Sequence, residues 1–362
     1  MELKISKDQL SWAVNASMKA VPNRATTPIM ECILITVQDD EIRFTANNTE
    51  LGIEAYATGE AIEGGCVALD AKMLAPVVSK LPDGDITLKT DGESVLVKCG
   101  RSKFTLAGRD GSEFPIIDTI ERENKIMLGQ SELKDVIKQT VFCTAQNENN
   151  RIMTGSLFQI DGDKLKVIAL DGHRIAVREI TLDKSYPSVK AIIPAKTLQE
   201  VMKLLSDGDV DLYVTDSLIA FSFDNTLVTS RLIDGEFFDI DKIMQSNYET
   251  EVKVDRQELL ACVDRATLLV KEIDRKPVVF TIGDTMKAEI VTQLGSMSEE
   301  IEIETTGEGL VVGLNPRFLI DVMRVLDDEK ISMFFVNAKS PCYIKGEGYI
   351  YVVLPIQLRG SV

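Results

Sequence analysis

The sequence predicts an α+β protein made of three repeated domains, each with two helices packed on antiparallel sheets. The first observation is a recurring phrase: LPDGDITL begins at Leu81, LSDGDVDL at Leu205 and LDDEKISM at Leu326. The second is that each copy follows an amphipathic segment, and another helical phrase recurs in step with it. The third is that segments of alternating apolar and polar residues lie between these helices. A spacing of about 120 residues is much longer than the roughly 20 to 50 residues of a solenoid repeat, so the repeated units are whole domains.

Apolar residues at helical spacing predict six helices. Ser6 with Gln9, and Asp255 with Glu258, fit capping boxes at two of the starts. Asn-Pro at 315–316 fits an N-cap followed by proline at the first helical position. The predicted helices are 6–20, 70–81, 130–144, 194–205, 255–271 and 315–326.

The segments between the helices alternate with period two and are broken by Asx and Gly turns, which is typical of antiparallel strands in hairpins. These segments are 41–59, 164–180 and 285–304. LDGHRI in the second unit stands where the first unit has ANNTEL, so a turn between two strands is expected at 169–175 whatever its side chains do. The expected domains are 1–122, 123–245 and 246–362.

The composition is that of a soluble globular protein, with 44% hydrophobic and 27% charged residues. We expect no signal peptide and no membrane helix, because charges flank the first amphipathic run and no run of about 18 apolar residues occurs. Six scattered cysteines without a C-x-x-C pair indicate buried free thiols in a reducing cytoplasm. One histidine and no paired cysteines leave no typical zinc ligand set.

The net charge of −17 argues against nucleic acid if it is taken alone. The six predicted helices nevertheless hold 13 basic and 9 acidic residues, a net of +4, so the rest of the chain carries −21. Two interpretations remain open. The lysines and arginines populate solvated helix faces, since they are good helix formers. Alternatively, the helices share a surface that lines a path for a polyanion, with contact that is weak and independent of base sequence.

No catalytic or cofactor motif stands out. The sequence lacks a P-loop, a G-x-G-x-x-G after a strand and a G-x-S-x-G elbow. The only histidine, His173, lies beside Asp171, but residues so close in a strand or turn usually point apart. The sequence therefore predicts a protein that is not an enzyme and needs no cofactor or metal.

The triple repeat, DGHR at 171–174, the R-x-x-x-P-I stretch at 24–29 and the terminal YVVLPIQL together resemble the bacterial DNA polymerase III β subunit family, the sliding clamps. The resemblance covers the whole chain. It implies the DNA-clamp fold, with two chains closing head to tail into a ring of six similar domains, helices inside and sheets outside. Such a ring encircles duplex DNA without sequence preference and tethers the polymerase III catalytic subunit. The resemblance also implies dependence on a separate ATP-dependent clamp loader.

The family also binds short peptides of its client proteins in a hydrophobic pocket between the second and third domains. The resemblance implies a pocket made of Met153, Leu170, Gly172, His173, Arg174, Ile175, Phe238, Lys242, Ile243, Pro341, Tyr343, Val352, Val353, Leu354, Pro355, Ile356 and Leu358. Arg174 and His173 would orient the peptide. An open alternative is that Val352, Val353 and Ile356 belong to a terminal strand that fills its own core.

Three positions depart from the commoner family pattern around this pocket. Phe238 stands where proline usually follows, and Gln357 stands where an arginine is frequent. The chain also continues beyond Leu358 with Arg-Gly-Ser-Val. These differences concern the shape of the pocket and the choice of clients.

For DNA, the resemblance points to Arg24 and to the loop 146–153, where Arg151 is the basic residue. Further candidates lie on the predicted helices. They are Lys19, Lys72, Lys134, Lys138, Lys196, Lys203, Arg265, Arg317 and Arg324.

The subunit contact is expected between a basic segment, GRSKF at 100–104, and an acidic one, SEEIEIE at 298–304. Leu268 and Leu269 add apolar surface in the family pattern. The expected interface residues are Leu81, Arg101, Lys103, Phe104, Leu268, Leu269, Glu299, Glu300, Glu302 and Glu304. Alternatively, the two segments are unrelated solvated edge strands.

Two other functions remain as alternatives to a homodimeric clamp. One is a scaffold of the same fold that does not encircle DNA, and it would be a stable monomer or a dimer unable to stay on circular DNA. The other is an enzyme centred on Asp171 and His173, for which His173→Ala would abolish a turnover and leave peptide binding intact.

Overall fold

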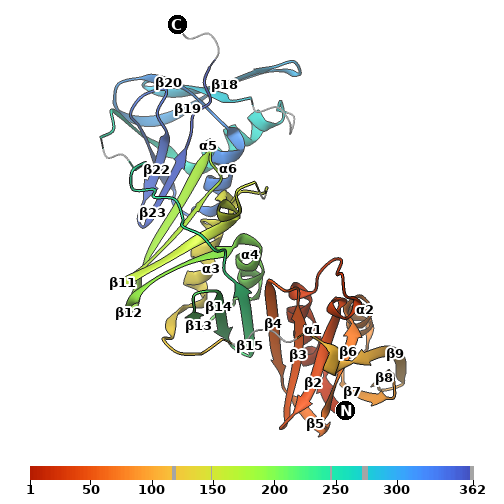
Figure 1. Ribbon diagram of the computed structural model, residues 1–362. Helices are drawn as coiled ribbons and strands as arrows, with labels where there is room; N and C mark the ends of the chain where they lie inside the picture. Colours follow the sequence, from red (N-terminus) through yellow and green to blue (C-terminus); the bar gives the residue numbers. More distant parts are fainter. Residues whose placement is uncertain (116–119, 148, 245–246, 271–275, 359–362) are drawn as a thin grey trace. The chain divides into compact units, whose positions relative to one another are not determined.

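The computed structural model describes residues 1–115, 120–147, 149–244, 247–270 and 276–358. The chain forms two compact units (Figure 1). Unit 1 comprises residues 1–133 and 196–232, and unit 2 comprises 134–195 and 233–362. The middle third of the sequence therefore contributes elements to both units.

Every predicted helix is present within its predicted range. The helices are α1 (Lys7–Ser17), α2 (Ala71–Lys80), α3 (Gln130–Lys138), α4 (Ala195–Leu204), α5 (Arg256–Thr267) and α6 (Pro316–Val325). Residue 271, at the end of the fifth prediction, lies outside the described residues. None of the described helices is both long and apolar enough to span a membrane.

The three predicted side-chain caps are present, and Asp70 caps α2 in addition. Ser6 and Asp255 accept hydrogen bonds from the backbone N–H three residues on, at 3.3 and 2.8 Å. Asn315 accepts from the N–H two residues on, at 3.0 Å. The side chain of Gln9 does not complete a capping box. It accepts from the N–H of Thr58 at 3.1 Å and so ties the helix to the neighbouring sheet.

The third helix ends earlier than predicted, at Lys138. The hydroxyl of Thr140 donates to the carbonyl of Val136 at 2.7 Å, and the Thr140 backbone leaves the helical region with φ −126°. Such side-chain bonds to the preceding turn compete with helix propagation. The chain continues as a 3-10 turn at Val141–Cys143.

Unit 1 contains one antiparallel sheet. Its strands are β1 (Glu2–Ser6), β2 (Cys32–Gln38), β3 (Glu41–Asn47), β4 (Leu51–Ala57), β5 (Gly59–Glu63), β6 (Gly65–Asp70), β7 (Asp85–Asp91), β8 (Ser94–Cys99), β9 (Ser102–Asp110), β10 (Ile126–Gly129), β13 (Asp209–Val214), β14 (Leu218–Phe223) and β15 (Thr226–Arg231). Their order is β10-β13-β14-β15-β4-β3-β2-β6-β9-β8-β7-β1-β5. The pairing of β15 with β4 joins the second repeat to the first.

Unit 2 contains a second antiparallel sheet. Its strands are β11 (Gly155–Leu170), β12 (Arg174–Pro194), β16 (Thr250–Asp255), β17 (Val278–Ile282), β18 (Thr285–Thr292), β19 (Gly295–Gly307), β20 (Leu310–Leu314), β21 (Lys330–Phe335), β22 (Cys342–Gly346) and β23 (Tyr349–Val353). Their order is β11-β12-β23-β22-β21-β16-β19-β18-β17-β20. The pairing of β23 with β12 joins the third repeat to the second.

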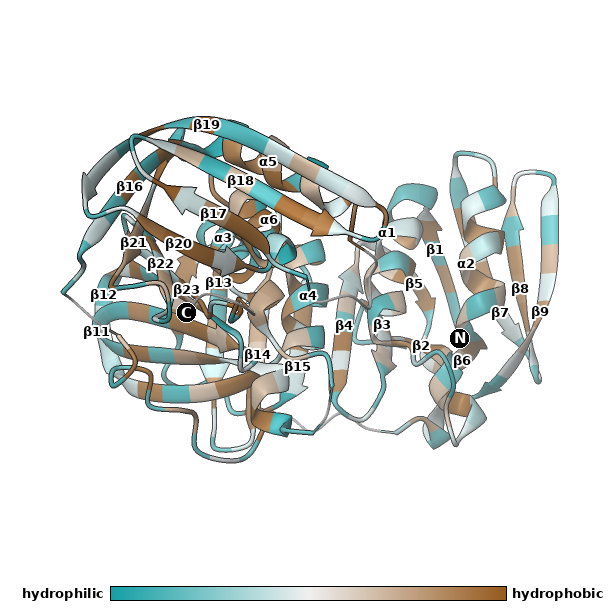
Figure 2. Cartoon of the chain, turned by 90° about the horizontal axis from the view of Figure 1, so that it is seen from above, coloured by the Kyte–Doolittle hydropathy of each residue, from teal (hydrophilic) through white to brown (hydrophobic). Residues whose placement is uncertain are grey.

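Each sheet buries one face under a helix pair. In unit 1, Leu10 and Val14 of α1 lie in the core with Leu74 of α2. In unit 2, Leu259 of α5 and Leu319 of α6 occupy the same kind of position. Apolar and polar residues alternate along strands of both sheets (Figure 2), which matches their alternating burial. Full burial of such side chains contributes about 1.5–3 kcal/mol each.

The three repeats share one turn geometry. Asn48 and Asp171 each follow a strand, and Thr292 is the last residue of β18. The side-chain oxygen of each accepts from the backbone N–H two residues later, at 3.1, 2.9 and 3.0 Å. Asp171 therefore corresponds to Asn48, one position later than the sequence match of LDGHRI with ANNTEL suggests. The expected turn at 169–175 is confirmed.

Candidate functional site

The turn between β11 and β12 is built by Asp171. Its Oδ1 accepts hydrogen bonds from the backbone N–H groups of His173, at 2.9 Å, and Arg174, at 3.1 Å. Gly172 has a φ of +87°, a left-handed conformation that a side chain would strain. Asp171 and Gly172 of DGHR thus each have a local structural reason.

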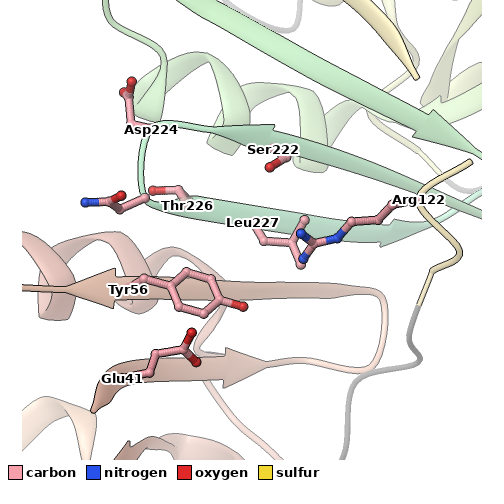
Figure 3. A pocket seen from close by; sticks show the side chains of 8 residues that line it. Glu41, Tyr56, Arg122, Ser222, Asp224, Thr226 and Leu227 are labelled. Carbon is pink, nitrogen blue, oxygen red and sulfur yellow. The ribbon is translucent and has the colours of Figure 1, made fainter. Parts of the chain in front are cut away.

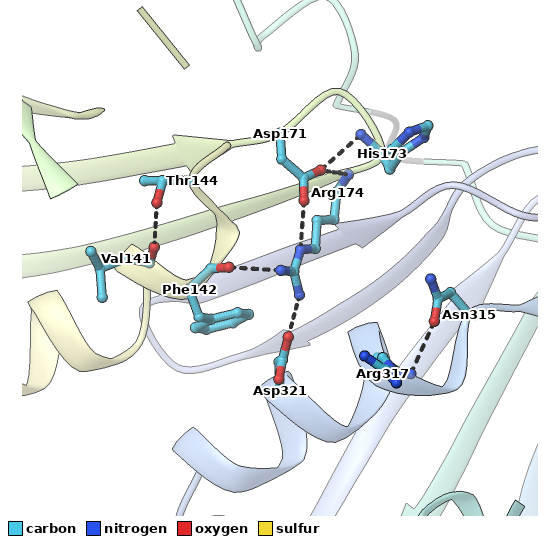
Figure 4. A network of polar contacts seen from close by, with 9 residues as sticks. All are labelled: Val141, Phe142, Thr144, Asp171, His173, Arg174, Asn315, Arg317 and Asp321. Carbon is cyan, nitrogen blue, oxygen red and sulfur yellow. Dashed lines mark hydrogen bonds and ion pairs between the residues drawn. The ribbon is translucent and has the colours of Figure 1, made fainter. Parts of the chain in front are cut away.

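The guanidinium of Arg174 is engaged inside unit 2 (Figure 4). Its Nε donates to Asp171 Oδ2 at 2.9 Å, one terminal N–H group donates to Asp321 Oδ2 at 2.6 Å and the other to the carbonyl of Phe142 at 2.7 Å. The ring of Phe318 lies 4.4 Å from its central carbon. The side chain is only 11% exposed. Arg174 therefore holds the turn to α6 and to the 3-10 turn after α3.

His173 is exposed and lies next to this network. Its imidazole stacks on Phe318 with ring centres 6.5 Å apart, and its backbone carbonyl accepts from Leu354 N–H at 2.9 Å. The hydrogen bond between Asp171 and His173 joins the carboxylate to the backbone N–H and not to the imidazole (Figure 4). The geometry is that of a turn and not of an acid–base pair.

The segment after β23 lies along β20. Leu354 N–H donates to His173, and Ile356 N–H donates to the carbonyl of Gly313 at 2.8 Å. A Cβ on Gly313 would lie 3.0 Å from the backbone carbonyl oxygen of Ile356 and 2.7 Å from a methyl of Leu358, so glycine suits this close approach. Pro355 is half-buried. The residues Arg-Gly-Ser-Val at 359–362 lie outside the described residues.

An apolar cluster in unit 2 gathers several predicted pocket residues. Leu170, Ile175, Tyr343 and Val352 are buried together, with Met153 packed on the edge. Val353 is equally buried on the other face of β23, in the core under α5 and α6. Both valines of this strand therefore fill core positions.

Exposed apolar side chains border this cluster. Phe238, Ile243 and Leu354 are 39%, 41% and 40% exposed. The hydroxyl of Tyr343 donates to the carbonyl of Ile243 at 2.8 Å and fixes that segment to the cluster. Of the remaining predicted residues, Gly172 and Lys242 are exposed and Pro341 is half-buried.

Sequence reasoning missed Phe142, Phe318 and Asp321, which surround Arg174. Phe318 and Asp321 are three residues apart on α6, so their spacing places them on one helix face. The sequence contains no signal that this face meets a turn about 150 residues earlier.

The predicted DNA residue Arg24 is exposed, in a segment between α1 and β2. Glu31 organises this segment by accepting from Ala25 N–H at 3.1 Å. Lys72 donates to the carbonyl of Asn23 at 3.1 Å and to Glu31 at 3.4 Å. The hydrogen bond from Ala25, together with Lys72, holds the pKa of Glu31 below its usual value. Lys72 thus supports the turn that presents Arg24.

Several other candidate DNA residues are ion-paired. Lys203 lies 2.8 Å from Glu200, and Arg324 lies 3.3 Å from Asp264. Lys134, Arg151, Lys196 and Arg317 are exposed, whereas Lys19 and Lys138 are half-buried. Residue 148 of the expected DNA loop lies outside the described residues.

Two strands keep an edge that no other described strand covers. Residues 102–107 of β9 pair with β8, and β6 reaches only residues 108–110. Residues 295–302 of β19 pair with β18, and β16 reaches only residues 303–307. Open edges of this kind pair readily with another chain.

The two open edges carry charges of opposite sign. Arg101 and Lys103 are exposed at the start of β9. The acidic residues of β19 are Glu299, Glu300, Glu302 and Glu304. Arg265, a predicted DNA residue, instead forms an ion pair with Glu299 within the same subunit. Glu304 lies beyond the open segment, where β19 pairs with β16.

Apolar side chains accompany these edges. Phe104 is 40% exposed and Leu268 is 79% exposed, while Leu269 is half-buried. Leu81, expected at the interface, is only 2% exposed and belongs to the core of unit 1. It therefore has almost no surface to offer a partner.

Unit 1 also holds a polar cavity of about 350 Å³ (Figure 3). It lies where β3 and β4 meet β14 and β15, and the side chains of Tyr56, Glu41 and Arg122 turn towards it. The lining residues are Glu41, Tyr56, Arg122, Ser222, Asp224, Asn225, Thr226 and Leu227. None of them is a predicted site residue.

The cysteines are all free thiols, as expected. Cys66 is exposed and the other five are buried. Burial raises the pKa of Cys143 and Cys342, and it raises that of Cys262 to about 11. No group of three or more His, Cys, Asp or Glu side chains in the described part of the chain could hold a metal ion.

Comparisons with known proteins match the chain from end to end. Family models of the DNA polymerase III beta subunit match its N-terminal domain at 1–118, its central domain at 127–239 and its C-terminal domain at 241–356. The beta sliding clamp of Bacillus subtilis (strain 168) is 30% identical over 99% of this chain and 100% of its own.

Solved structures agree in fold. A crystal structure from Eubacterium rectale, described as a DNA polymerase III beta subunit, is 46% identical and superimposes with a TM-score of 0.95, covering 98% of this chain and 99% of its own. The DNA polymerase sliding clamp of Bacillus subtilis is 29% identical with a TM-score of 0.95, covering 99% of both chains.

Proposed function

Because this chain belongs to the DNA polymerase III beta subunit family, we propose that it acts as a DNA sliding clamp, a homodimeric ring that encircles duplex DNA and tethers the replicative polymerase. A sliding clamp is a non-catalytic processivity factor and not an enzyme. The observation that carries the proposal is the match to three successive family domains along the whole chain. The proposed domain boundaries are 1–122, 123–245 and 246–362, of which residues 245 and 246 lie outside the described part.

The charge distribution suits a ring that slides. Modest positive charge on the helices keeps the duplex centred, while the strongly acidic remainder limits adhesion to other polyanions. Lys203 and Arg324 form ion pairs with neighbouring carboxylates, which weakens their binding to DNA phosphates. Arg24 and Arg151 are the proposed DNA contacts outside the helices.

We propose that client proteins bind over the apolar cluster of unit 2 through a short peptide. The exposed side chains of Phe238, Ile243 and Leu354 supply accessible apolar surface above the buried Leu170 and Tyr343. Arg174 is a positioning residue in this proposal, because its donors bind Asp171, Asp321 and Phe142. The proposed clients are the polymerase III catalytic subunit, an ATP-dependent clamp loader and other proteins with a clamp-binding motif.

The proposed cellular location is the cytoplasm. Six free thiols, five of them buried, are compatible with a reducing compartment.

Retention on nicked circular DNA tests the clamp function. Loader and ATP are supplied for assembly and then removed, and gel filtration is run before and after the circle is linearised. Retention on the circle with loss after linearisation is the expected result, since the link is topological. Equal retention on both forms would indicate ordinary affinity and contradict the ring. Failure of either form to retain the protein with a competent loader would favour a scaffold that does not encircle DNA.

A further inference from the structure

A lysine on β22 lies among three aromatic rings in unit 2. The ammonium of Lys345 is 4.5 Å from the ring centre of Tyr248, 5.5 Å from that of Tyr343 and 6.0 Å from that of Phe334. The ring of Tyr248 contacts the other two rings, with centres 5.3 Å from Tyr343 and 5.1 Å from Phe334. We call these four residues the lysine–aromatic cluster. Only Tyr343 belongs to the pocket that the resemblance implied.

The rings attract this lysine through its charge. The face of an aromatic ring carries partial negative charge and attracts an ammonium within about 6 Å of the ring centre. Lys345 is half-buried, and partial removal from water strengthens this attraction. Within the part of the chain that the structure describes, no carboxylate forms an ion pair with Lys345. The cluster therefore attaches Tyr248, just before β16, to the surface of β22.

Tyr248 belongs to the connector, residues 232–249, which links β15 to β16. Two side chains of β22 contact the connector. The hydroxyl of Tyr343 donates to the carbonyl of Ile243 at 2.8 Å, and the ammonium of Lys345 lies over the ring of Tyr248. These contacts stand on either side of residues 245 and 246, which lie outside the described part of the chain. β22 thus fixes the connector at two points.

The corresponding place in unit 1 has a different composition. β14 and β15 correspond to β22 and β23, because each pair is a hairpin with a two-residue turn whose second strand joins the preceding repeat. Counted from the turn, Ala220 stands in the place of Tyr343, and Ser222 stands in the place of Lys345. Ser222 lines the polar cavity (Figure 3). Of the two junctions, the one that carries the proposed client site is the one with the lysine and the tyrosine.

We propose that Lys345 is a positioning residue for client binding. Its ammonium holds Tyr248 on β22, and this contact keeps the connector in the conformation that presents Phe238 and Ile243 to a peptide. A segment that is already ordered in its bound conformation loses less entropy on binding, so affinity rises. Lys345 acts through Tyr248 and does not need to touch the peptide. The inference rests on the proposed client site and names a residue that shapes it from outside.

Peptide affinity tests this role in the full-length protein. The probe is a fluorescein-labelled peptide that spans the clamp-binding motif of the polymerase III catalytic subunit, and its Kd is measured by fluorescence polarisation. Lys345→Met removes the ammonium and keeps a similar apolar stem, so the Kd should rise about three- to tenfold. Lys345→Arg keeps a cation over the rings and should stay within about twofold of the parent. Lys184→Met removes an equal charge from an exposed site on β12 and should leave the Kd unchanged.

Hydrogen exchange separates positioning from the overall stability of unit 2. The N–H groups of Ile243 and Met244 donate to the carbonyl of Ile240, at 2.9 and 3.2 Å, so their exchange reports on the order of the connector. Lys345→Met should speed the exchange of these two amides at least about threefold. The amides of β23 should stay as protected as in the parent. Faster exchange in β23 to the same degree would show a general loss of stability and overturn the proposal.

A double-mutant cycle tests whether Lys345 acts through Tyr248. Tyr248→Leu should raise the peptide Kd by a factor similar to that of Lys345→Met. The double variant should bind only slightly more weakly than either single variant, because both changes remove the same contact. Losses that multiply in the double variant would show that the two residues act independently and would contradict the proposed role.

The outcomes separate this inference from the client site itself. Unchanged peptide affinity in Lys345→Met, together with weaker binding by Phe238→Ser, would overturn the role of Lys345 and leave the client site intact. Equal losses in Lys345→Met and Lys345→Arg would show that the positive charge does not hold the connector. A peptide that does not bind the parent, or that binds Phe238→Ser and Leu354→Ser as tightly as the parent, would overturn the client site and this inference with it.

Discussion

The carboxylate of Asp321 lies 2.6 Å from the guanidinium of Arg174, and this ion pair fastens the turn after β11 to helix α6. The same guanidinium binds Asp171 and the carbonyl of Phe142. The most recognisable motif in the sequence, DGHR, therefore contributes an arginine that serves the protein's own structure. In the proposed function, the client peptide binds the neighbouring surface of Phe238, Ile243 and Leu354.

Removal of Arg174 should destabilise unit 2. Arg174→Ala leaves two carboxylates and a carbonyl without their partner, and we expect the free energy of unfolding to fall by about 2–3 kcal/mol in urea titrations. Arg324→Ala removes an exposed ion pair on the same helix and should cost less than about 1 kcal/mol. If both variants lost the same free energy of unfolding, the Arg174 network would contribute no more to stability than an exposed ion pair.

Client peptide affinity should depend on the exposed apolar rim. Phe238→Ser or Leu354→Ser removes roughly 1–1.5 kcal/mol of burial on binding, which corresponds to about a tenfold rise in Kd by fluorescence polarisation. Ile62→Ser, an exposed apolar residue on β5 of unit 1, is the control and should have no effect. Unchanged affinity in both rim variants would place the peptide elsewhere.

The thiols should react at very different rates. Cys66 is exposed, whereas burial holds the pKa of Cys262 at about 11, so only about 0.1% of that thiol is ionised at pH 8. In the native protein one thiol per chain should react rapidly with a thiol reagent. After denaturation all six thiols should react. Cys66→Ser should remove the fast equivalent. A second fast thiol in the native protein would contradict the described packing.

The turn that presents Arg24 should contribute stability that depends on pH. The pKa of Glu31 is lowered in the folded protein by the hydrogen bond from Ala25 and by Lys72, so its ionised form is favoured by folding. This contribution is complete above the carboxyl's ordinary pKa, near 4.5. It is lost as the pH falls through the lowered value. Glu31→Gln should therefore be less stable than the parent at pH 7, and the two unfolding curves should converge at low pH.

A constant difference between those curves across the pH range would mean that the charge of Glu31 plays no part. Lys72→Met is the matched variant, because it removes the ammonium and keeps the backbone bond from Ala25. It should reproduce part of the loss at pH 7.

The sequence predicted the helices and the hairpins because these are properties of local spacing, and the triple repeat because similar phrases recur about every 120 residues. Apolar positions at helical or alternate spacing, and caps such as Ser6 and Asp255, depend on neighbours a few residues away. The end of α3 was the largest exception. The hydroxyl of Thr140 turns back to the carbonyl of Val136, and the pattern of apolar residues carries no sign of it.

What only the tertiary structure decided is which distant segments meet and which side chains they leave exposed. Arg174 became a structural residue because α6 and the turn after α3 bring Asp321 and Phe142 to it. Leu81 became a core residue, while Phe104 remained on an open strand edge. Strand pairing between repeats joins residues more than 150 positions apart, and its register is set by packing and backbone hydrogen bonds that no local pattern encodes.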